Sequence, residues 1–169
     1  DTLDWQNALR NAMRQAPDCI LIGEIRDKET MEAALAYAQT GHLCLATLHA
    51  NNAYHALNRI FSFFPTDARA LLSLDLAATL KCIISQRLVK RPDGGRIPAV
   101  EVLLNSRQVA ELIERGEISA IREAMEQSLA EGSQTFEQDL FRLYKDKVIT
   151  LEEALANSDS PTNLSWLIN

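Results

Sequence analysis

Two short and mostly apolar runs, separated by one amphipathic segment, constrain the fold of this chain more than any other feature. The runs cover residues 19–23 and 42–47, and residues 28–39 between them carry apolar side chains at helical spacing. A strand that is apolar along its whole length, rather than at alternate positions, is typical of a parallel sheet that is covered on both faces. A strand, a helix and a strand in this order predict a right-handed βαβ unit.

The rest of the chain predicts further helices and one hairpin. Residues 4–16 have helical spacing, Asn51 or Asn52 is expected to cap a helix that ends at Pro65, and Thr66 is expected to cap another that runs to about Lys81. Strands over residues 82–90 and 96–104 flank a Pro-Asp-Gly-Gly sequence, which is a turn signal.

From residue 105 onward the pattern is wholly helical. Gly116 and Gly132 are expected to close two of the helices, and Thr150 and Glu153 have the spacing of a capping box for a later one. The sequence therefore predicts an α/β unit over residues 1–104 and a helical lobe over residues 105–169.

Composition narrows the class of protein. Hydrophobic residues make up 47% of the chain and charged residues 24%, as in an ordinary globular protein. The net charge of −6 argues against binding to nucleic acid or to an anionic membrane surface. Three cysteines without a C-x-x-C pair argue against a disulfide framework or a zinc site, and a reducing compartment is the simplest interpretation.

Three polar residues follow the two apolar runs. Glu24 comes directly after the first run, and Thr47 and His49 come at or just after the end of the second. Because the carboxyl ends of parallel strands meet at one edge of a sheet, we expect these side chains to lie in one crevice. A carboxylate, a hydroxyl and an imidazole are suitable groups for aligning water against a phosphate.

Each of these residues also has an ordinary structural interpretation. Glu24 could be a solvated loop residue, His49 could be structural, and Asp27 could cap the next helix with Arg26 as its ion-pair partner. On the hairpin, basic residues are expected to line a solvated sheet edge, where they discourage pairing with other strands: Arg87, Lys90, Arg91 and Arg96.

Taken together, the segments resemble a known family. Residues 17–27 (PDCILIGEIRD) closely resemble the Walker B segment of secretion-type ATPases, and residues 40–51 (TGHLCLATLHAN) resemble their histidine box. Further matches are residues 8–14 (ALRNAMR), 63–65 (FFP), 84–89 (ISQRLV) and 99–103 (AVEVL). The resemblance is to the PilT/PilU family of ATPases that retract type IV pili in twitching motility. Residues 42–45, 49–52 and 134–136 favour the PilU branch.

The resemblance implies a RecA-like P-loop ATPase core, followed by a helical lobe that retraction requires. Glu24 would polarise the attacking water and hold Mg²⁺ through water, and His49 would contact the γ-phosphate with Thr47 nearby. Gly23 stands where many other P-loop ATPases carry a metal-binding aspartate.

The same resemblance implies supporting residues and partners. Arg26 and Asp27 would support the site and its subunit contacts, and residues 109–116 (VAELIERG) resemble the family's retraction motif. The implied assembly is a homo-oligomer, a hexameric ring, that works with a partner retraction ATPase and a pilus platform protein of the inner membrane. The implied location is cytoplasmic and peripheral at the bacterial inner membrane, without nucleic acid.

A phosphate-cradling motif is not found in the sequence. The P-loop requires G-x-x-x-x-G-K-[ST], and none of the six glycines is followed by lysine. Members of the family carry the P-loop upstream of the Walker B segment. The resemblance therefore implies the C-terminal part of a longer ATPase, with ATP and Mg²⁺ as cofactors of the parent protein and neither bound tightly by this chain alone.

Two other functions stay open. One is a part of a pilus assembly or type II secretion ATPase, although those commonly carry paired C-x-x-C motifs for zinc in this region, and this chain has no such pair. The other is a non-catalytic accessory module that docks on a partner retraction ATPase.

Overall fold

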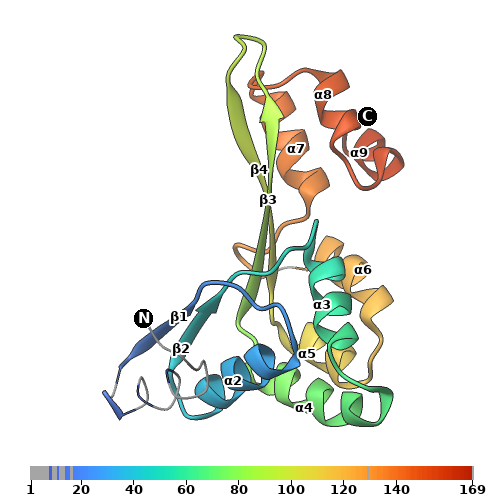
Figure 1. Ribbon diagram of the computed structural model, residues 1–169. Coiled ribbons are helices and arrows are strands. Elements are labelled where there is room, and N and C mark those ends of the chain that lie inside the picture. The colour runs from blue at the N-terminus through green and yellow to red at the C-terminus, as the bar shows by residue number, and fades with distance from the viewer. Residues whose placement is uncertain (1–7, 9–10, 12–13, 16, 129, 169) are drawn as a thin grey trace.

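A long antiparallel hairpin connects two groups of helices in the computed structural model of this chain (Figure 1). The structure describes residues 8, 11, 14–15, 17–128 and 130–168. The helix predicted over residues 4–16 therefore lies largely outside the described residues. One helical group lies with a small parallel sheet at one end of the hairpin, and the other group flanks the half of the hairpin that carries its turn.

The predicted βαβ unit is confirmed. Strand β1 (Cys19–Ile22) pairs in parallel with β2 (Leu43–Ala46), and helix α2 (Lys28–Gln39) connects them. Asp27 caps α2 by accepting a hydrogen bond from the backbone N–H of Thr30. Just past the end of α2, Gly41 has a φ of 91°, a conformation that glycine adopts without steric cost.

The expectation that these strands are covered on both faces is wrong for the described residues. Ile20 and Ile22 are buried against α2, but Leu21 on the other face is 73% exposed, and Leu43 and Leu45 are exposed as well. The physical reason is that α2 packs on one face of a sheet of only two strands, and no described element covers the opposite face.

Helix α3 (Ala53–Ser62) begins at Asn52, whose side chain accepts from the N–H of His55, so one of the two predicted caps is confirmed. The predicted cap at Thr66 is wrong, because residues 66–68 form a 3₁₀ turn that precedes α4 (Arg69–Thr79). A short turn of this kind is common at the start of a helix.

The predicted hairpin is confirmed along its full length. Strand β3 (Cys82–Lys90) pairs with β4 (Arg96–Leu104) in an antiparallel ladder, with Ser85 opposite Glu101. Its inner face carries Arg87 and the buried side chains of Ser85, Val89 and Glu101, so the face that meets the helices is partly polar.

The described part of the chain after the hairpin forms the helices α5 (Arg107–Glu114), α6 (Ile121–Glu126), α7 (Phe136–Lys145), α8 (Leu151–Ala156) and α9 (Pro161–Ile168). The expected stop at Gly116 is confirmed, whereas α6 ends before Gln127, and Gly132 belongs to the loop that follows. Thr150 caps α8 as predicted, while the carboxylate of Glu153 accepts from the backbone N–H of Lys90 and so ties α8 to β3.

Among the described residues, two apolar clusters stabilise the fold. The first apolar cluster joins β1 and the helices α2 to α6, and its large members include Ile22, Tyr37, Leu57, Leu76, Leu103, Ile113 and Ile121. The second joins the turn half of the hairpin to α7, α8 and α9 through Val89, Ala99, Phe136, Leu140, Leu143, Ile149, Ala154 and Leu164. Each cluster contains residues from both sides of residue 105: α5 and α6 pack in the first, and the second joins the hairpin to α7. The division into residues 1–104 and 105–169 stays a prediction.

Candidate functional site

The ends of β1 and β2 are joined by hydrogen bonds beyond their ladder. The hydroxyl of Thr47 donates to the carbonyl oxygen of Gly23, and the N–H of Ile25 donates to the carbonyl oxygen of Thr47 at 2.9 Å. These bonds fix the backbone on both sides of Glu24. The structure thus places Glu24 and Thr47 at one edge of the sheet, as the parallel arrangement predicts.

Glu24 lies between two cationic or potentially cationic side chains. Its Oε2 accepts from Nε of Arg26 at 2.5 Å, and its Oε1 lies 3.0 Å from Nε2 of His49. The Glu24 side chain is 20% exposed, whereas the His49 side chain is 83% exposed and Arg26 is similarly open to solvent. Because a carboxylate has about four acceptor positions, these two contacts leave positions at which Glu24 can accept from a water molecule.

Gly23 and Asp27 flank this group in different ways. A Cβ atom added at Gly23 would meet no other atom within 4 Å, so no described neighbour requires glycine there. Both the N–H and the hydroxyl of Thr30 donate to Asp27, at 2.8 and 2.7 Å, and these hydrogen bonds lower the pKa of the Asp27 carboxyl. The described contacts of Asp27 are those of a helix cap.

The described residues contain no group of three or more His, Cys, Asp or Glu side chains arranged to hold a metal ion. At this edge Glu24 offers carboxylate oxygen atoms, and oxygen is the ligand that Mg²⁺ prefers. The cysteines are free thiols, and burial raises the pKa of Cys44. In the part of the chain that the structure describes, no helix combines the length and apolar character that crossing a membrane requires.

Sequence reasoning missed a second polar group, which contacts residues 51–53, just after His49 in the chain. Arg87, expected on a solvated edge, instead stacks 3.9 Å above the ring of Phe136 and forms a 2.5 Å ion pair with Asp159. The expectation is wrong for Arg87, which lies on the inner face of the hairpin, where α7 packs. The other three basic residues of the hairpin are exposed, as expected: Lys90, Arg91 and Arg96. Glu101, on the same face, is buried, and this burial raises the pKa of its carboxyl.

Comparison with known proteins decides the family. A model of the type II/IV secretion system protein family matches residues 1–94, which is more than half of the chain. The chain belongs to the type II/IV secretion system protein family. The matched residues include Glu24, Thr47 and His49, which form the edge described above.

Individual members of this family extend the similarity. The chain is 51% identical over 169 residues to the type IV pilus ATPase PilU of Pseudomonas aeruginosa, covering 99% of the chain and 44% of that protein. The crystal structure of the pilus retraction motor PilT with bound ADP superposes with a TM-score of 0.87 at 39% identity, over 98% of this chain and 47% of that one.

A relative from another branch of the family matches less of the chain. The type IV pilus assembly ATPase PilB of Acinetobacter baylyi is 44% identical over 89 residues, which is 53% of this chain and 14% of that protein. The chain spans about half the length of the curated relatives that it matches along its whole length.

Proposed function

We propose that this chain supplies the water-activating side of an ATP site in a motor that retracts type IV pili. The observation that carries the proposal is the placement of Glu24 at the edge of β1, between Arg26 and His49. Support also comes from the similarity to PilU and PilT, which extends along nearly the whole chain.

In this proposal, Glu24 orients the attacking water and accepts its proton at a carboxylate oxygen. Arg26 holds the other oxygen of Glu24 and keeps the carboxylate in place. The exposed imidazole of His49 faces the terminal phosphate, and Thr47 keeps the two strand ends at a fixed distance through its bond to Gly23. Asp27 fixes the start of α2, and therefore the direction in which the chain leaves the site.

The residues of this chain fit only one side of such a site. The Glu24 carboxylate suits contact with Mg²⁺ through water, and the space beside Gly23 leaves room for ligand groups. A bound Mg²⁺ would supply positive charge that offsets the negative charge of the phosphates. The sequence has no lysine-bearing P-loop, so we place ATP binding in a longer protein of which this chain is the C-terminal part.

We further propose that the longer protein works as a homo-oligomeric ring, a hexamer, in the cytoplasm at the inner membrane. A partner retraction ATPase and the membrane platform protein of the pilus are its proposed partners. We propose no nucleic-acid partner, because a net charge of −6 leaves no basic excess with which to bind phosphates.

Retraction is favoured over assembly or type II secretion by the extent of the similarity. The match to PilB stops after 89 residues, whereas the match to PilU continues through the helices α5 to α9. The absence of a C-x-x-C pair agrees with this choice. An accessory module that docks on a partner ATPase is the second candidate, and it is distinguished by experiment.

The test is Glu24→Gln in the longer protein. Loss of the general base should lower ATP turnover by about 10²–10⁴-fold, while nucleotide binding stays largely intact. The matched control is Glu29→Gln, on the exposed first turn of α2, which should leave turnover unchanged. Equal turnover in the wild type and Glu24→Gln would contradict the role of Glu24. Full twitching motility with the Glu24→Gln protein would instead favour the accessory module.

A further inference from the structure

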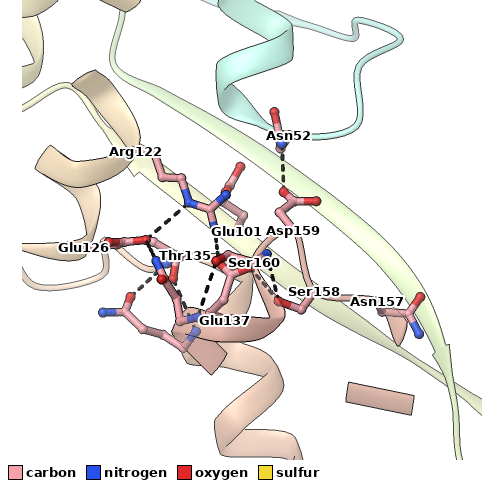
Figure 2. A network of polar contacts seen from close by, with 12 residues as sticks. Asn52, Glu101, Arg122, Glu126, Thr135, Glu137, Asn157, Ser158, Asp159 and Ser160 are labelled. Carbon is pink, nitrogen blue, oxygen red and sulfur yellow. Dashed lines mark hydrogen bonds and ion pairs between the residues drawn. The ribbon is translucent and has the colours of Figure 1, made fainter. Parts of the chain in front are cut away.

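The loop that carries His49 is held at both ends. Residues 47–52 have no helix or strand of their own. The front of the loop is tied to the end of β1 through Thr47. Its rear end is tied to residues distant along the chain, in the hairpin and just before α9, and Figure 2 shows one of these contacts, between Asn52 and Asp159. His49 lies between the two ties.

Glu101 makes the first of the rear contacts. Its Oε1 accepts from the N–H of Ala53 at 2.7 Å, at the first residue of α3. The neighbouring Asn52 caps the same helix with its side-chain oxygen. A buried carboxylate on the central hairpin therefore fixes the helix start that lies only four residues after His49.

Arg87 and Asp159 make the second of the rear contacts. Asp159 accepts from Nδ2 of Asn52 at 2.8 Å and from Arg87 at 2.5 Å, so one carboxylate joins the loop to the hairpin. Arg87 also donates to the carbonyl oxygens of Asn51 and Asn157, at 3.3 and 2.6 Å. The side chains of Arg87 and Asp159 are only 20% and 25% exposed, so solvent screens this pair less than an open surface pair.

The segment that carries Asp159 is itself fixed. Oε1 of Glu137 on α7 accepts from the hydroxyl of Ser158 and from the N–H of Ser160, both at 2.9 Å. Oε2 of the same carboxylate lies 3.1 Å from the guanidinium of Arg122. Figure 2 shows Glu137 at the centre of these contacts, below Asp159 and Asn52. Asp159 therefore holds Asn52 from a rigid support.

We propose that Arg87 and Asp159 are positioning residues for His49, through which the C-terminal helices set the place of the histidine in the ATP site. The inference rests on the proposed function. Asn51 lies two residues from His49, a reach of about 7 Å for an extended chain, so displacement of its anchors moves the imidazole directly. Neither Arg87 nor Asp159 touches Glu24, and both act on the site only through the loop.

Two substitutions break this tie in different ways. Asp159→Asn puts an amide where two donors converge, so either Arg87 or Asn52 loses its acceptor. Asn52→Ser keeps an oxygen that can cap α3 but is too short to reach Asp159. The matched control is Asp93→Asn, which breaks an Arg91–Asp93 pair of 2.6 Å at the hairpin turn, far from the loop along the hairpin.

The first readout uses this 169-residue chain without nucleotide. Hydrogen exchange of the amides over residues 48–56 should accelerate about tenfold in Asp159→Asn and in Asn52→Ser, and should be unchanged in Asp93→Asn. Unchanged exchange in both Asp159→Asn and Asn52→Ser, the two tie variants, would overturn the inference whatever the ATPase assays give. Because the readout is local, a variant that loosens the whole molecule is recognised by faster exchange in α7 as well.

The second readout uses the longer protein. If His49 faces the terminal phosphate, a displaced loop weakens binding of a non-hydrolysable ATP analogue and not of ADP. We expect the preference for the analogue over ADP to fall about tenfold in both tie variants and in His49→Ala, with ADP affinity unchanged. A role that is merely structural would weaken both nucleotides equally, and that result would overturn the inference.

The outcomes separate the inference from the proposed function. A wild-type longer protein that neither binds nor hydrolyses ATP would overturn the proposed function, and the inference with it. An active wild type with an inactive Glu24→Gln variant would support the proposed function. If His49→Ala then lowers the preference for the ATP analogue and the tie variants do not, only the inference fails.

Discussion

The two sheets of this chain differ in how their edges and faces are completed. The hairpin is secured by two carboxylates of the second helical group, since Asp139 accepts from the N–H of Val100 and Glu153 accepts from that of Lys90. The backbone of Gln134, just before α7, adds a β-bridge with Val102. The parallel pair β1–β2 has one buried face and one open apolar face. The chain therefore completes its hairpin from its own residues, while the candidate site lies on the sheet that the described residues leave half covered.

The two regions should differ most in how far a Leu→Ala substitution lowers the free energy of unfolding. Leu140 is fully buried in the second apolar cluster, and Leu140→Ala should lower the free energy of unfolding by about 2–5 kcal/mol. Leu21 in β1 is 73% exposed, and Leu21→Ala should change it by no more than about 0.5 kcal/mol. Urea unfolding of this chain measures both, and comparable losses would show that the face around Leu21 is buried in solution.

The next largest effect should come from the edge of the hairpin. Asp139→Ala leaves the N–H of Val100 without its acceptor, and we expect a loss of about 2 kcal/mol in the free energy of unfolding. Asp146→Ala is the matched control, because Asp146 is exposed and also faces Arg142, at 3.8 Å. Equal losses in the two variants would mean that Asp139 acts through Arg142 rather than through the strand.

Helix caps should give a smaller contrast. Thr135 is buried and forms a reciprocal capping box with Gln138, so Thr135→Ala should cost about 1–2 kcal/mol in thermal or urea unfolding. Asp27→Ala, at the start of α2, should cost less because the cap is open to solvent. The lowered pKa of Asp27 also predicts a pH dependence. The contribution of this cap to the free energy of unfolding is present above the ordinary aspartate pKa and is lost as pH falls through the folded-state pKa. A larger loss in Asp27→Ala would reverse the ranking of the two regions.

The mildest variant is Glu101→Gln, which keeps an oxygen that can accept from Ala53. Burial is the main cause that raises the pKa of Glu101; the hydrogen bond from Ala53 and the charge of Arg87 oppose it, and Asp159 and Glu137 add to it. The folded protein therefore holds this proton more tightly than the unfolded chain, and stability falls as pH rises from the ordinary glutamate range to the folded-state pKa. Urea midpoints between about pH 4 and pH 8 should fall less steeply in Glu101→Gln. Parallel curves would show that Glu101 is not the group that titrates.

Local patterns predicted most of the described elements and the placement of Glu24, Thr47 and His49 at one edge of the sheet. The apolar runs at residues 19–23 and 42–47 place Glu24, Thr47 and His49 at one edge, because parallel neighbours end on the same side of a sheet. The turn at residues 92–95 likewise fixes the hairpin and its register. These features depend on neighbours in sequence, or on pairing rules that leave few choices.

The sequence did not reveal the buried polar group, because its partners are far apart along the chain. Both faces of β3 mix polar and apolar side chains, so alternation does not decide whether Arg87 or Leu88 points inward, and the exposed one is Leu88. Arg87 lies inward because Phe136 and Asp159 receive it there. The exposed face of β1–β2 was also missed. An apolar run indicates that both faces of a strand are apolar, but it does not show which element packs on each face.

The length of the hairpin has a mechanical consequence. Each strand has nine residues, which corresponds to about 30 Å of extended chain, and the two apolar clusters grip its opposite ends. A pull between the helices at one end and those at the other runs along both strands in the same direction, because each cluster contacts both β3 and β4, so the two strands share the load and the ladder is not peeled open. The hairpin should therefore resist stretching and transmit displacement from one helical group to the other.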